Sequence, residues 1–219
     1  MQLRRAEAVQ NMLCHSALWR GSGLACVATP SLVSGFAALD AELPGGGWPV
    51  GALTEILPAH QGIGELRLLG PALAGLSASG RRLAWIAPPY LPYPPALSAT
   101  GIDLSRLVVV KTRSDRETLW AAEQALASNA CGAVLVWPTA VRYQELRRLQ
   151  LAAEGGSVLA VLFRPAKVAA ESSPAILRIA LATADGGLAV HILKRRGAPA
   201  SQPVLLAPGT EGPTPPCSG

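Results

Sequence analysis

Five short apolar runs mark the expected strands of this chain. They comprise residues 51–57, 82–87, 107–111, 132–137 and 157–163, and stretches of mixed polarity separate them. Each run is nearly continuous, whereas strands with one solvated face alternate between apolar and polar residues. The pattern therefore predicts a parallel sheet that is covered on both faces.

Helical spacing fills two of the intervening stretches. Ser114 and Glu117 form a capping box, and apolar residues then recur on one face. Residues 141–154 repeat the helical pattern, and Gly155-Gly156 supplies a stop signal. We expect helices in both places, as part of the helical layers that cover the sheet.

The last apolar segments predict a change of strand direction. Residues 176–181 and 188–193 flank Asp185-Gly186-Gly187, which is a hairpin signal. The expected fold class is therefore α/β, with a mostly parallel sheet, helices on both faces and an antiparallel hairpin at the C-terminal edge.

The two ends of the chain differ from its middle. Residues 1–30 predict a short helix followed by an irregular linker. The tail from Pro208 is too rich in glycine and proline to bury a core, so we expect it to be disordered. The expected organisation is an N-terminal helix and linker (1–30), a core domain (31–207) and a disordered tail (208–219).

Composition excludes several classes of protein. No apolar run reaches 18 residues and no secretion signal is visible, so we expect no membrane span and a cytoplasmic location. Four scattered cysteines without a CxxC pair exclude a zinc ribbon and fit a reducing compartment. A net charge of +5 allows an acidic partner such as DNA without demanding one.

A glycine-containing loop follows the first expected strand, where an open α/β sheet binds phosphate. It has about the length of the GxxxxGK[ST] loop, but Glu65-Leu66 stands where lysine and a hydroxyl residue are needed. We interpret it as a vestigial phosphate loop that leaves only weak nucleotide binding open. Its candidate residues are Pro58, His60, Gly62, Gly64 and Glu65.

Other parts of an ATPase site are also missing. The second run ends in Ile86-Ala87-Pro88 and the fourth in Val136-Trp137-Pro138, without a carboxylate to activate water or hold magnesium. Gly70-Pro71 is expected to interrupt the helix after the loop, because a proline inside a helix costs about 3 kcal/mol. We therefore expect no catalytic residue, no bound cofactor and no metal.

The segment Ser34–Ile56 resembles the segment that leads into the ATPase core of RecA-type recombinases. The likeness extends over roughly residues 33–206. Within this superfamily the chain resembles the ImuA family, on Trp19-Arg20-Gly21, Leu43–Pro49, Phe163-Arg164-Pro165 and Leu193–Gly197.

This resemblance implies a RecA-like core and a non-catalytic role in translesion DNA synthesis induced by the SOS response. The implied partners are an ImuB-type protein related to Y-family polymerases and an error-prone C-family DNA polymerase, with RecA and DNA as further contacts. Two alternatives stay open: a SulA-like inhibitor that binds the tubulin-like division protein, and an atypical DNA-dependent ATPase.

Basic residues of the second half are candidate contacts for a partner or DNA. By the resemblance, Arg164 replaces a nucleotide-sensing glutamine, and Lys194 and Arg196 match a lysine pair that reaches a neighbouring subunit. The short segments 138–142 and 166–173 imply no filament on DNA. The candidates are Arg142, Arg147, Arg148, Arg164, Lys194, Arg195 and Arg196; the alternative is an ordinary solvated surface.

The tryptophans and one proline-rich run give two further expectations. Trp85, Trp120 and Trp137 are expected to pack in the core, and Trp48, between Gly47 and Pro49, is expected at the surface. The run Pro88–Pro95 (PPYLPYPP) is stiff and aromatic, which suits either protein docking or a rigid loop.

Overall fold

The structure is a computed structural model, and it describes residues 30–185, 187–197 and 202–207. The expected N-terminal helix, most of the linker and the tail lie outside these residues. Within the described ranges, no helix combines the length and the apolar character that crossing a bilayer requires.

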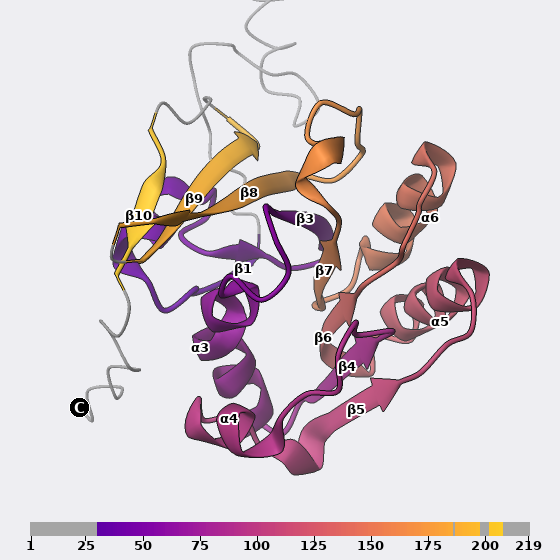
Figure 1. Cartoon of the computed structure of the whole chain (residues 1–219). Helices are drawn as coiled ribbons and strands as arrows, with labels where there is room; N and C mark the ends of the chain where they lie inside the picture. The colour runs from indigo at the N-terminus through magenta and orange to yellow at the C-terminus, as the bar shows by residue number, and fades with distance from the viewer. Residues whose placement is uncertain (1–29, 186, 198–201, 208–219) are drawn as a thin grey trace, which may run out of the picture.

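An eight-stranded sheet forms the centre of the domain (Figure 1). Its order is β10-β9-β8-β3-β7-β6-β4-β5. The strands are β3 (Ala52–Pro58), β4 (Arg82–Ile86), β5 (Leu107–Val110), β6 (Cys131–Val136), β7 (Leu159–Phe163), β8 (Leu177–Ala184), β9 (Gly187–Lys194) and β10 (Val204–Leu206). Two short strands, β1 (Ser31–Leu32) and β2 (Trp48–Pro49), pair separately.

The strand directions match the sequence prediction. Neighbours from β5 through β4, β6, β7 and β3 to β8 all pair in parallel, and β9 is antiparallel to both β8 and β10. All seven residues of β3 are buried, because other strands flank it on both sides and a helical layer covers each face. The mostly parallel sheet with an antiparallel C-terminal edge is thus confirmed.

Helices cover both faces of the sheet (Figure 1). One layer contains α2 (Ala37–Glu42), α3 (Glu65–Ala78) and α4 (Pro94–Ala99), and the other contains α5 (Asp115–Ala127) and α6 (Tyr143–Ala153). Two single 3-10 turns, η1 (Leu104–Arg106) and η2 (Ala166–Val168), complete the described elements. Ile56 and Leu53 of β3 face opposite layers, so alternate strand residues feed two separate apolar cores.

The helix after the loop corrects one expectation. α3 runs without interruption through Pro71. The proline removes one backbone donor, but the helix buries Leu68, Leu69 and Leu73 against the sheet. This burial outweighs the local cost, since tertiary packing supplies most helix stability in proteins.

Two tryptophan expectations were also wrong. Trp48 is fully buried in the apolar core that also contains Leu39 of α2, whereas Trp120 lies on the outer face of α5 with 62% of its surface exposed. Trp85 is buried as expected. Trp48 pairs with Leu32 in the short β1–β2 ribbon, and no local sequence signal predicted that pairing.

Candidate functional site: the carboxyl edge of the sheet

An open cavity of about 770 Å³ lies where the parallel strands end. The residues that end or follow five neighbouring strands contribute to its wall, namely Pro58, Ala87, Thr112, Trp137 and Arg164. Because all five strands are parallel, their carboxyl ends meet at one edge. This is the place at which the sequence predicted the phosphate loop.

The loop between β3 and α3 is occupied by the side chain of Glu65, the first residue of α3. One carboxylate oxygen of Glu65 accepts a hydrogen bond of 2.8 Å from the backbone N–H of Gly62, and the other accepts one of 3.1 Å from the N–H of Gly64. Gly62 and Gly64 have φ angles of 83° and 119°, which glycine adopts readily. The Glu65 side chain is buried at the positive end of α3, so an internal anion takes donors that a phosphate group would need.

The other carboxylate of the cavity wall supports a loop. Asp115 accepts hydrogen bonds from the backbone N–H groups of Thr139 and Ala140, at 2.7 and 3.0 Å. The position after β6 carries Trp137, whose ring stacks on Phe163 with centroids 4.6 Å apart. The position after β6 is therefore aromatic, and the nearby Asp115 carboxylate is engaged by backbone N–H groups.

A buried ionic cluster stands behind this cavity. Glu55 of β3 is completely buried and receives a 2.8 Å hydrogen bond from Nε of Arg178 and a 2.7 Å hydrogen bond from the Ser173 hydroxyl. Arg164 lies 3.6 Å from Glu55 and also donates to Glu171 at 2.8 Å. Arg164 therefore lines the cavity from a buried, ion-paired position.

Arg178 also holds the segment that connects β7 to β8. Its guanidinium donates to the backbone oxygens of Val168, Ala169 and Glu171, at distances from 2.8 to 3.1 Å. The sequence analysis missed this cluster. The available signal was a charged residue inside each of two apolar runs, Glu55 and Arg178, because buried charges need partners.

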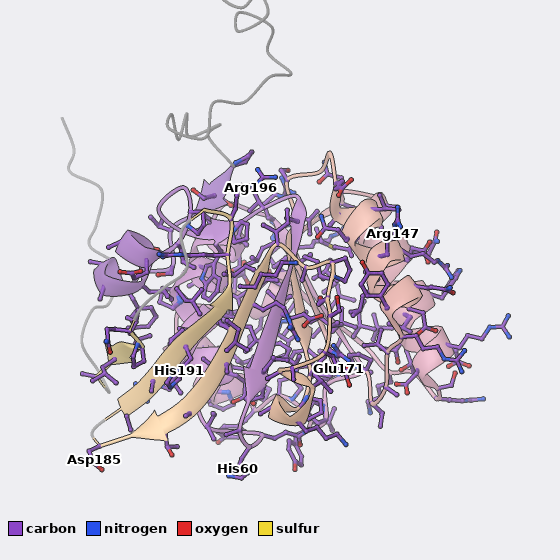
Figure 2. All side chains as sticks on the ribbon, turned by 90° about the horizontal axis from the view of Figure 1, so that it is seen from above. His60, Arg147, Glu171, Asp185, His191 and Arg196 are labelled. Atoms are coloured by element: carbon purple, nitrogen blue, oxygen red, sulfur yellow. The ribbon has the colours of Figure 1, made fainter. Side chains whose placement is uncertain are left out.

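The seven predicted basic contacts come from three parts of the fold: α6 and the residue before it, the residue after β7, and the end of β9. Arg142, Arg147 and Arg148 are exposed on or beside α6, where Arg148 pairs with Glu123 of α5. Lys194 is the last residue of β9, and it donates to the backbone oxygen of Ser173. Arg195 follows it and donates to the Glu42 carboxylate. Since β9 runs antiparallel, its end lies away from the carboxyl edge, and Figure 2 shows His60 and Arg196 at opposite ends of the molecule.

The remaining polar chemistry of the described residues is sparse. No group of three histidine, cysteine, aspartate or glutamate side chains in the described part of the chain is arranged to hold a metal ion. His191 is exposed on β9, and burial raises the pKa of the Cys131 thiol. Cys14, Cys26 and Cys217 lie outside the described residues.

The chain is an α/β domain with a cavity at the carboxyl edge of its sheet and a glycine-containing loop occupied by the Glu65 carboxylate. No family model matches the chain. The chain is similar to Protein ImuA of Caulobacter vibrioides strain NA1000, with 31% identity over 144 residues, 63% of this chain and 59% of that protein. The resemblance to ImuA found in the sequence is thereby confirmed.

SulA proteins are more distant relatives. The chain is 32% identical over 109 residues to the cell division inhibitor SulA of Photorhabdus laumondii, which covers 50% of this chain and 62% of that protein. The SulA of Edwardsiella piscicida is also 32% identical over 109 residues, 49% of this chain and 65% of that protein. The chain thus spans about three-fifths of the length of the curated relatives that it matches.

Proposed function

We propose that this protein is a RecA-like, non-catalytic accessory of SOS-induced translesion DNA synthesis. It docks with an ImuB-type protein and an error-prone C-family DNA polymerase, with RecA and DNA as further contacts. The similarity to ImuA supports this assignment over a longer stretch than the similarity to SulA does, 144 residues against 109.

The observation that carries the non-catalytic part is the position of the Glu65 carboxylate. A triphosphate in this loop would lose the N–H donors of Gly62 and Gly64 and would face a buried negative charge. Two like charges about 4 Å apart repel by roughly 4 kcal/mol near a protein surface, which is enough to prevent useful binding. The fold therefore serves as a scaffold for docking.

Two measurements on the full chain test the proposal. Titration calorimetry with magnesium-ATP is expected to detect no saturable binding in the micromolar range, and single-stranded DNA is expected to stimulate no phosphate release. A pulldown with the ImuB-type protein from the same genome is expected to retain the chain. Tight nucleotide binding or DNA-dependent phosphate release would instead support the atypical ATPase. Failure of the ImuB-type protein to retain the native chain would refute the docking role.

A SulA-like role is the second candidate, because two relatives named cell division inhibitor SulA match at 32% identity. This role predicts that overproduction makes cells filamentous and that the chain binds the purified tubulin-like division protein. Normal division during overproduction, together with retention by the ImuB-type protein, would favour translesion synthesis.

A further inference from the structure

Three large side chains project from the connection between β4 and α4. Tyr90, Leu91 and Tyr93 are 71%, 70% and 70% exposed. Of the ten large hydrophobic side chains that are exposed in the described residues, these three fall within four consecutive positions. Such clustering is unusual, since surface hydrophobic residues in soluble domains are normally scattered singly.

The backbone holds this projection at both ends. The N–H of Ala87 donates to the oxygen of Val110 on β5 at 2.9 Å, which anchors the start of the connection to the sheet. At the other end, the oxygen of Tyr93 accepts from the N–H groups of Ala96 and Leu97 in the first turn of α4, and the Leu97 side chain is buried. The connection between β4 and α4 is therefore anchored to the sheet at its start and to the first turn of α4 at its end (Figure 1).

Prolines restrict the segment between these anchors. Pro88, Pro89, Pro92, Pro94 and Pro95 account for five of the eight residues from 88 to 95. Each proline fixes its own φ angle and limits the residue before it, so little backbone entropy remains to be lost when the segment is bound. Tyrosine adds contact area at low entropic cost and carries a hydroxyl for the rim of an interface.

Charge decides between the classes of partner. No charged residue occurs from Leu83 to Ile102, a stretch of 20 residues that includes the whole projection. Nucleic acid binding needs cations that neutralise phosphates, and this segment offers none. An uncharged projection with three exposed apolar side chains instead matches an uncharged, apolar cleft on a protein.

We propose that residues 88–95 are the docking element of this protein, and that Tyr90, Leu91 and Tyr93 insert into an apolar cleft of a partner protein. The inference rests on the proposed accessory function and adds the surface that performs it.

The test compares three forms of the full chain in binding to the ImuB-type protein, measured by surface plasmon resonance. The first is native, and the second carries Tyr90→Ser, Leu91→Ser and Tyr93→Ser. The third is a matched control that carries Val33→Ser, Leu151→Ser and Leu205→Ser, three side chains that are 66%, 56% and 66% exposed on other elements. Because all six positions are exposed, both variants are expected to melt within a few degrees of the native chain.

The expected result is a loss of affinity of at least about tenfold in the projection variant, with the control close to native, since buried aromatic anchors dominate interfaces. Equal binding by the native chain and the projection variant would overturn this inference and leave the accessory function standing. No binding by the native chain would overturn both. A selective loss of self-association or of binding to single-stranded DNA in the projection variant, with partner binding intact, would also refute it.

Discussion

The buried pair of Glu55 and Arg178 makes the sharpest prediction about stability. The change Arg178→Met keeps much of the side-chain volume and removes the charge and every donor. Glu55, which has no exposed surface, then loses its 2.8 Å partner, and three backbone oxygens of the segment between β7 and β8 lose theirs. Glu55 keeps Arg164 at 3.6 Å and the Ser173 hydroxyl, but it loses its closest cationic partner. Removing one member of a buried ion pair costs about 3–5 kcal/mol.

Thermal and urea denaturation, followed by circular dichroism, measure this loss. For a domain of this size each kcal/mol lowers the melting temperature by about 2–4 °C, so a fall of roughly 6–20 °C is expected. Arg147→Met is the matched control, because Arg147 is exposed on α6 and its loss should change stability by less than about 0.5 kcal/mol.

A double variant separates the ion pair from simple loss of packing. Glu55→Leu combined with Arg178→Met leaves no isolated buried charge, so it should be less destabilising than the sum of the two single changes. If Arg178→Met costs less than about 1 kcal/mol, or if the two changes add without coupling, the account of the cluster is wrong.

Three further predictions concern single positions. Gly51→Ala should lower the free energy of unfolding by more than about 1 kcal/mol, because φ is +69° and a new Cβ would lie 2.5 Å from a backbone oxygen. Gly75→Ala should raise it by about 0.5–1 kcal/mol, because a Cβ at this position in α3 meets nothing within 4 Å. Urea titrations measure both changes. Since its thiol pKa is raised by burial, Cys131 should react with iodoacetamide at pH 8 more slowly in the native than in the unfolded chain; equal rates in peptide mass spectra would refute this. Trp120→Ala should change stability by less than about 0.5 kcal/mol, against about 3–5 kcal/mol for Trp85→Ala, as thermal melts would show.

The local pattern was sufficient for seven of the ten described strands and for two of the helices. The five apolar runs correspond to β3, β4, β5, β6 and β7 within a residue or two, and the Ser114 cap stands at the start of α5. These features depend on residues close together in the chain, such as an apolar run or a side chain that caps the next turn. The hairpin of β8 and β9 was predictable for the same reason.

Local reasoning failed where distant segments meet. Pro71 was expected to break α3, but the helix runs through it because its buried face packs on the sheet. Trp48 and Trp120 exchanged their expected positions, because burial depends on which neighbour covers each side chain. The buried partners Glu55 and Arg178 were missed for the same reason, since they are 123 residues apart in the chain.

The amino-acid sequence alone determined the fold class, the strand directions and the presence of a glycine-containing loop without a lysine, because hydrophobic periodicity and residue type are local properties. Only the tertiary structure decided that the Glu65 carboxylate occupies that loop, that Glu55 and Arg178 meet in the interior, and that Tyr90, Leu91 and Tyr93 project outward together. The reason is physical: hydrogen bonds and burial depend on distances in space, and chain folding sets those distances between residues as far apart as 55 and 178.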